Sequence, residues 1–112
     1  MAEGKKFYED FAASIDKMKA QTPSMIQGFG TLFAKVMGEG AMTAQEKELV
    51  AVGIAVAIQC TPCIKLHVKK GLEAGASREQ ILEAASVAVM MAGGPAYTHV
   101  PVVIESLEAL QP

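Results

Sequence analysis

The stretch TAQEKELVAVGIAVAI, residues 43–58, decides how the rest of the chain is interpreted. Thr43 followed three residues later by Glu46 is a capping box, which marks the start of a helix. Beyond this start the stretch is apolar almost all round, and a helix without a polar face is buried on every side. Its many Val and Ile residues also fit a buried strand, but the capping box and the alanine content favour a helix.

The chain is short for the amount of apolar side chain that it carries. It has 112 residues, of which 51% are hydrophobic and 20% are charged. A chain of this length forms one domain, which we expect to span residues 1–112. Alone, such a domain buries only about two thirds of its unfolded surface. We therefore expect a homo-oligomer, in which another subunit covers part of residues 43–58.

Charge and hydropathy exclude several classes of partner. The net charge is −2 and the isoelectric point is about 5.6, so there is no basic excess for a nucleic acid. The longest apolar run, residues 49–58, has ten residues, whereas a membrane-spanning helix needs about 20. The N-terminal residues do not resemble a secretory signal. The sequence thus predicts a cytoplasmic protein with no nucleic-acid or membrane partner.

Caps and apolar periodicity predict an all-α, compact domain of about six helices, with no alternating pattern typical of strands. The expected helices run over residues 5–20, from Pro23 to Gly38, from Thr43 to the turn before Thr61, from Pro62 to Gly71 or Gly75, from Ser77 to Gly93, and from about Pro95 to Leu110. In the second helix, the apolar residues expected to face the core are Met25, Ile26, Phe29, Leu32, Phe33 and Val36.

The stretch CTPCIKLH, residues 60–67, contains both cysteines of the chain. If Thr61 caps a helix and Pro62 is its first residue, Cys63 lies in the first turn. Free backbone N–H groups and the positive end of the helix dipole then favour its thiolate. Cys60 can reach back to form a disulfide. His67 follows Cys63 by four residues, shares its helical face and can exchange protons there.

Glu48 is a candidate partner for His67 if the helices on either side of the turn at residues 59–62 pack antiparallel. At about 1.5 Å per residue, Glu48 lies about 15 Å from that turn and His67 about 10 Å. The two side chains are then nearly level, with an offset or a water molecule between them. A carboxylate beside the imidazole would fix its tautomer and stabilise the imidazolium ion.

Glu48, Cys60, Cys63 and His67, at these spacings, resemble the signature of the AhpD-like alkylhydroperoxidases of the carboxymuconolactone decarboxylase superfamily. The resemblance implies an all-helical oligomer, either a trimer or a hexameric trimer of dimers. It implies a thiol-dependent reductase of small-molecule peroxides, with Cys63 as the peroxidatic cysteine, Cys60 as the resolving cysteine, and Glu48 and His67 as a proton relay. It also implies a dithiol reductant, either a lipoyl group or a thiol protein, and no cofactor. Pro62 stands where better-known members often have histidine.

Three alternatives remain open from the sequence. The same fold can reduce the disulfide of a protein or small molecule, with little activity on peroxide. Cys60, Cys63 and His67 can instead bind zinc, with Glu48 or His99 as the fourth ligand. The cysteines can also be inert in a purely structural helical oligomer. No other candidate site residue lies at a helical or motif spacing from His99. We therefore expect His99 to be structural or to lie at a subunit contact.

Overall fold

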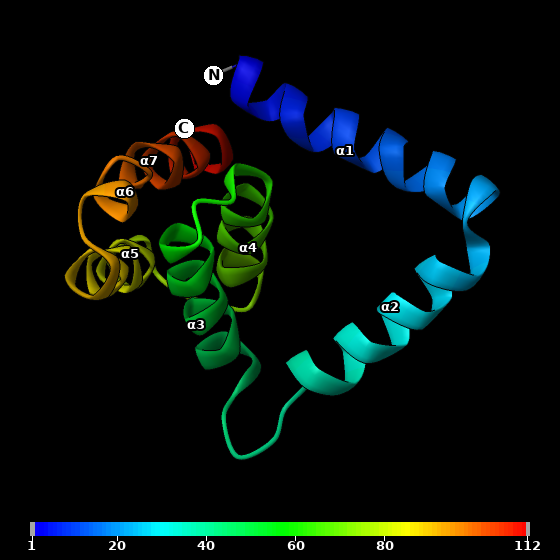
Figure 1. Cartoon of the computed structure of the whole chain (residues 1–112), viewed down its shortest axis with the longest axis horizontal. Coiled ribbons are helices and arrows are strands. Elements are labelled where there is room, and N and C mark those ends of the chain that lie inside the picture. The colour runs from blue at the N-terminus through cyan, green and yellow to red at the C-terminus, as the bar shows by residue number, and fades with distance from the viewer. Residues whose placement is uncertain (1, 112) are drawn as a thin grey trace.

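The computed structural model describes residues 2–111, in which all regular secondary structure is helical (Figure 1). The seven helices are α1 (Ala2–Gln21), α2 (Pro23–Met37), α3 (Ala44–Ala57), α4 (Thr61–Glu73), α5 (Arg78–Ala92), α6 (Gly94–Tyr97) and α7 (Val100–Leu110). The predicted all-α fold is confirmed, and the strand alternative for residues 43–58 is wrong. The last predicted helix is divided into the single turn α6 and the longer α7.

The core lies between α3, α4, α5 and α7. These helices supply every large side chain that is fully buried in the described part of the chain: Val52, Val56, Ile64, Val68, Ile81, Val103 and Leu107. We call α3 to α7 the body of the molecule. None of the helices within residues 2–111 is long and apolar enough to cross a membrane.

Two capping boxes start α3 and α5, as the sequence predicts. Thr43 Oγ1 accepts a hydrogen bond from the Glu46 backbone at 3.1 Å, and Glu46 Oε1 accepts one from the Thr43 backbone at 2.8 Å. Ser77 and Gln80 make the same reciprocal pair at the start of α5. Each pair satisfies two backbone N–H groups that have no partner within the helix.

A tight corner joins α3 to α4. The backbone N–H of Cys60 donates to the Ala55 carbonyl and that of Gln59 to the Val56 carbonyl, both at 3.1 Å. These two bonds form a Schellman motif, in which the residue at the corner takes a left-handed conformation. Here it is Gln59, with φ of +60°, whereas the similar turn after α4 uses Gly75. The corner leaves Cys60 directly before the first residue of α4.

The first two helices form a V-shaped arm that extends from the body (Figure 1). None of residues 23–37 is buried, although α2 is rich in apolar residues. The expectation that its whole apolar face lies in the core of the chain is therefore wrong, since no helix within residues 2–111 covers that face. Ile26 and Phe33 are partly buried, but the following side chains are more than half exposed: Met25, Phe29, Leu32 and Val36.

A few polar contacts hold the arm to the body. The Tyr8 hydroxyl of α1 donates to the Lys65 carbonyl of α4 at 2.8 Å. Lys47 Nζ donates to the carbonyls of Val36 and Gly38 at 2.8 and 2.7 Å, which ties the end of α2 to α3. Three lysines of α4 also lie over aromatic rings of the arm: Lys65 over Phe7, Lys69 over Tyr8 and Lys70 over Phe33.

Candidate active site

The start of α4 holds a disulfide between Cys60 and Cys63, whose Cα atoms are 5.2 Å apart. The sequence predicts that these two sulfurs can reach each other, and the structure brings them together. The predicted cap is wrong by one residue, because Cys60 rather than Thr61 caps the helix. Cys60 has the extended backbone that a cap requires, and its Sγ accepts a hydrogen bond from the Cys63 backbone at 3.3 Å. Pro62 is tolerated as the second helical residue because N–H groups in the first turn have no partner within the helix.

The disulfide lies at the surface. Cys60 and Cys63 are partly buried, and the two residues between them, Thr61 and Pro62, are exposed. Cys63 also packs against the hydrophobic core. The disulfide therefore lies between the exposed Thr61 and Pro62 on one side and the core, which contacts Cys63, on the other.

Glu48 and His67 form a hydrogen-bonded pair between α3 and α4. His67 Nδ1 lies 2.7 Å from Glu48 Oε1, and the Glu48 side chain is only 8% exposed. The sequence predicts the two side chains at a similar level with a gap between them, and the structure shows a direct contact. A carboxylate partner places the hydrogen on Nδ1 and leaves Nε2 as the nitrogen that can exchange a proton.

Gly71 of α4 lies beside Glu48 of α3. A Cβ atom at Gly71 of α4 would lie 3.9 Å from the Glu48 Cβ atom. This is an ordinary van der Waals distance, so α4 packs against α3 beside the Glu48 side chain. The imidazole and the carboxylate meet without a water molecule between them.

Phe33 of the arm contacts the imidazole of His67. The two rings are stacked, with centroids 6.2 Å apart and planes 22° apart. The sequence gives Phe33 only as a core residue of the second helix and does not predict this contact. No rule of residue spacing predicts a contact between Phe33 and His67, because it depends on where the arm lies relative to α4.

An apolar cavity of about 350 Å³ lies between α2 and α3 and reaches His67. His67 is the one polar side chain among its lining residues. The others are Phe29, Leu32, Phe33, Val36, Met37, Ala51, Ile54, Ala55 and Ile58. An apolar molecule entering this cavity would meet the imidazole as its only polar contact.

The zinc alternative has no matching arrangement in the structure. Within residues 2–111, no group of three or more His, Cys, Asp or Glu side chains is placed to hold a metal ion. His99, the alternative fourth ligand, instead uses Nδ1 for a 2.8 Å hydrogen bond to the Pro95 carbonyl. His99 therefore has a local structural contact at the start of α7.

Comparison with known proteins places the chain in a family. The profile of the Carboxymuconolactone decarboxylase family matches residues 23–101. "Uncharacterized protein 4 in cox locus" of Paracoccus denitrificans is 38% identical over 88 residues, which are 79% of each chain. An uncharacterized protein of Cupriavidus necator is 30% identical over 88 residues, covering 79% of this chain and 78% of its own.

Solved structures agree with this assignment. The carboxymuconolactone decarboxylase family protein lpg0406 of Legionella pneumophila has a TM-score of 0.87 and 32% identity, over 99% of this chain and 96% of its own. TM1620 of Thermotoga maritima has a TM-score of 0.85 and 27% identity, over 96% and 94%. A second structure of TM1620 describes a family protein for which a role in an antioxidative response has been suggested. The sequence, the helical fold and these similarities together show that the chain belongs to the carboxymuconolactone decarboxylase family.

Proposed function

We propose that the chain is an AhpD-like, thiol-dependent reductase of small hydroperoxides that cycles through the Cys60–Cys63 disulfide. The observation that carries the proposal is the hydrogen-bonded pair of Glu48 and His67, in which His67 lies on the same helix as Cys63 of the disulfide. His67 follows Cys63 by one turn of α4, a spacing that puts the two Cβ atoms about 5–6 Å apart. An acid–base group and a redox-active sulfur thus share one face of a helix.

The first step uses the reduced form of the chain. The Cys63 thiolate attacks the terminal oxygen of a hydroperoxide, and the O–O bond breaks. The alcohol leaves with a proton from His67 Nε2, and Cys63 becomes a sulfenic acid. Glu48 stabilises the imidazolium before the proton is given up.

The second and third steps restore the dithiol. The Cys60 sulfur attacks the Cys63 sulfur and expels the sulfenic oxygen as water, which forms the disulfide. A dithiol donor, either a lipoyl group or a small thiol protein, then supplies two electrons by thiol–disulfide exchange. We propose that the donor reaches the disulfide over the exposed Thr61 and Pro62, and that the protein works in the reducing cytoplasm. No cofactor takes part in these steps.

Intact-mass analysis of the reduced chain tests the cysteine cycle. One equivalent of an organic hydroperoxide is expected to remove two hydrogens per chain, and a dithiol is expected to restore them. The Cys60→Ser variant is expected to gain one oxygen on Cys63, and the Cys63→Ser variant is expected to gain none. Oxygen on Cys60 in the Cys63→Ser variant would reverse the two roles, and no mass change in the wild type would overturn the proposal.

The proton relay has its own test. Glu48→Gln and His67→Gln are each expected to slow peroxide turnover by about 10²-fold or more, the usual contribution of a general acid or base. Glu73→Gln is the matched control, because Glu73 is an exposed carboxylate on α4. Equal rates for Glu48→Gln and Glu73→Gln would remove Glu48 from the mechanism.

Reduction of an external disulfide is the second candidate function, and the exposure of Thr61 and Pro62 between the cysteines favours it. A substrate disulfide can approach the reduced cysteines from the same side as a thiol donor. Turnover of a hydroperoxide and of a model disulfide by the same preparation separates the two candidates. Faster turnover of the disulfide, with no response to Glu48→Gln, would favour the second.

A further inference from the structure

Lys70 lies on the same face of α4 as the residues to which we assign the chemistry. It follows Cys63 by seven residues and His67 by three, and side chains at these spacings lie along one face of a helix. The rise of the helix places Lys70 about 10 Å further along α4 than Cys63. A cation thus lies one turn beyond the imidazole, on the side away from the disulfide.

The ammonium group of Lys70 lies over the ring of Phe33. The distance from Lys70 Nζ to the ring centroid is 4.8 Å, and the same ring stacks on His67 with centroids 6.2 Å apart. Phe33 lines the apolar cavity of about 350 Å³ that reaches His67, whereas Lys70 is not one of the lining residues. The ammonium group therefore lies at the edge of this cavity, against a side chain that forms its wall.

Lys70 has no anionic partner among the side chains of residues 4–111. The carboxylate one turn further along α4, that of Glu73, pairs with Lys69 at 3.9 Å. The carboxylate of Glu48 bonds to His67 at 2.7 Å. A lysine ammonium has three hydrogen-bond donors and no acceptor. The donors of Lys70 can therefore bind an anion that comes from outside the chain.

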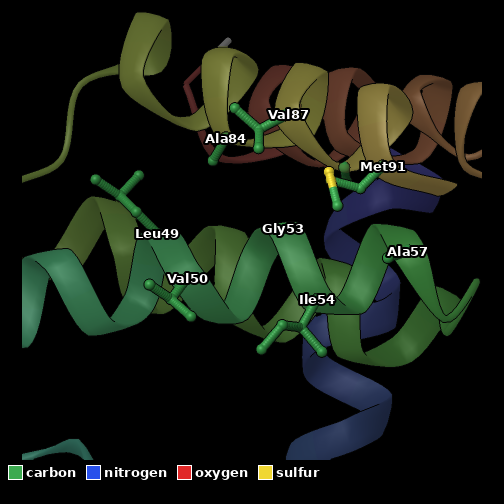
Figure 2. Close-up of a pocket in the computed structure, with 9 residues that line it drawn as sticks. Leu49, Val50, Gly53, Ile54, Ala57, Ala84, Val87 and Met91 are labelled. Carbon is green, nitrogen blue, oxygen red and sulfur yellow. The ribbon is translucent and has the colours of Figure 1, made fainter.

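A second apolar cavity, of about 450 Å³, lies between α3 and α5. Figure 2 shows Leu49, Gly53 and Ala57 along α3, facing Ala84 and Met91 along α5. Within the described part of the chain, no titratable side chain lines this second cavity. A reacting group placed there would have neither an imidazole nor a cation beside it. Of these two cavities, only the one at His67 joins an apolar wall to an acid–base group and a cation.

We propose that the chain selects hydroperoxides that carry a carboxylate on an apolar chain, as in a fatty-acid hydroperoxide, and that Lys70 binds this carboxylate. The hydroperoxide group lies at Cys63 and His67, and the remaining apolar chain lies in the cavity between α2 and α3. The two polar groups of such a substrate are then about 10 Å apart, the rise of α4 from Cys63 to Lys70. This role of Lys70 rests on the proposed function. The hydroperoxide becomes a hydroxyl group and water, while the two thiols become the disulfide.

The carboxylate adjusts the choice among apolar hydroperoxides. Lys70 is partly buried, and an ion pair that water still reaches changes affinity by about fivefold at most. The ester of the same acid keeps its contacts with the apolar wall and loses only the ion pair. Hydrogen peroxide gains neither contact, because it has no apolar body and no charge. We therefore expect the acid to be the best of the three substrates and hydrogen peroxide the worst.

Kinetics with linoleic acid hydroperoxide and its methyl ester test the role of Lys70. The two substrates share the apolar chain and the hydroperoxide group, and they differ only in the carboxylate. The wild type is expected to have an about fivefold lower KM for the acid and the same kcat for both. The effect falls on KM because a carboxylate far from the reacting atoms is bound equally in the ground and transition states. Lys70→Gln is expected to remove the difference in KM, and Lys70→Arg is expected to keep it.

Lys65→Gln is the matched control. Lys65 is also on α4, and its Nζ lies 4.9 Å from the centroid of another ring of the arm, that of Phe7, which does not line the cavity at His67. Lys65→Gln thus removes the same charge and the same kind of contact with the arm, and it is expected to keep the preference for the acid. Equal KM values for acid and ester in the wild type would overturn the proposal. A preference that survives in Lys70→Gln, or one that is lost equally in Lys65→Gln, would overturn it as well.

Binding of decanoate to the oxidised chain keeps this test separate from that of the proposed function. Decanoate has a carboxylate and an apolar chain but no hydroperoxide group, so its binding requires no turnover. By calorimetry, the wild type and Lys65→Gln are expected to bind decanoate about fivefold more tightly than Lys70→Gln does. If the wild type reduces no hydroperoxide, the proposed function fails, and decanoate binding alone decides the role of Lys70. Equal affinities of the wild type and Lys70→Gln for decanoate would then overturn that role.

Discussion

The body and the arm of this molecule are held in place in different ways. The body has a core of fully buried side chains, and capping boxes start two of its helices. In the arm, none of residues 23–37, which form α2, is buried. Thr22, directly before α2, does not cap that helix, because its Oγ1 donates a hydrogen bond back to the Met18 carbonyl. The body is thus held by its own buried core, whereas the arm is held to it by a few hydrogen bonds and by lysines that lie over aromatic rings.

The candidate site follows this division. The disulfide and Glu48 belong to the body, together with His67. The arm contributes the ring of Phe33 and one wall of the apolar cavity. The groups to which we assign the chemistry are therefore on the part of the molecule that has the buried core, and the arm borders only the cavity beside them.

Core substitutions should give the largest difference between the two regions. Ile64→Ala, at a fully buried position of α4, is expected to lower the free energy of unfolding by about 2–5 kcal/mol. Leu32→Ala, at a position of α2 that is 59% exposed, is expected to change the free energy of unfolding of the isolated chain by no more than about 0.5 kcal/mol. Urea denaturation measures both, and similar losses at low protein concentration would contradict the division into body and arm.

Protein concentration sharpens this first prediction. If a second copy covers Leu32, the effect of Leu32→Ala should grow as the protein concentration rises, because assembly stabilises the folded state by mass action. The effect of Ile64→Ala on unfolding should be nearly the same at all concentrations.

Helix caps should give the next largest difference. Thr43→Ala removes the side-chain oxygen that accepts a hydrogen bond from the Glu46 backbone. It is expected to lower the free energy of unfolding by about 1 kcal/mol. Thr22→Ala removes no such cap bond, so we expect a clearly smaller loss of unfolding free energy. The two midpoints in urea can be compared directly, since both variants replace a threonine before a helix. A larger loss for Thr22→Ala would mean that α2 is fixed from within the chain.

The contact of Phe33 with His67 should have a modest effect on activity. Phe33→Leu keeps an apolar side chain but removes ring stacking worth about 0.5–1.5 kcal/mol, which corresponds to a two- to tenfold slower peroxide turnover. The chemical shift of the His67 ring protons should change in the same variant. Phe11→Leu, on α1, is the control, and equal rates for the two variants would show that the arm does not act on the imidazole.

Alkaline pH should reveal the contact between α1 and α4. Burial raises the pKa of Tyr8 above its ordinary value of 10.0, and the opposing contribution of a hydrogen bond with Ser106 is smaller. As pH rises above 10.0, the unfolded chain loses the Tyr8 proton before the folded chain does, so the rise favours unfolding. The urea midpoint of the oxidised protein is expected to fall more steeply above this pH in the wild type than in Tyr8→Phe. Parallel curves would contradict this prediction.

Local signals predicted the body well. The starts of α3 and α5 follow from reciprocal contacts between residues three apart, which do not depend on the rest of the fold. Glu48 and His67 lie at similar distances from the corner between α3 and α4, and this follows from the fixed rise per residue along each helix. Their direct contact did not follow, because the distance between the two helices is a property of tertiary packing.

Features that depend on distant parts of the chain were not predictable. Periodicity places the apolar residues of α2 on one face, but it cannot say whether the same chain covers that face. The stacking of Phe33 on His67 depends on where the arm lies. The sequence predicts one helix from about Pro95 to Leu110, and the structure divides it into α6 and α7, since Pro101 lacks the N–H that would continue a helix through residues 98–99.

Cys60 has two structural roles besides its sulfur chemistry. Its backbone N–H completes the end of α3, and its Sγ accepts the hydrogen bond that starts α4. When the disulfide is reduced, Cys60 Sγ becomes a thiol or a thiolate, and we expect the strength of this hydrogen bond to change with it. We therefore expect amide hydrogen exchange at Cys63 to differ between the oxidised and the reduced chain, which would report the redox state without any enzymatic assay.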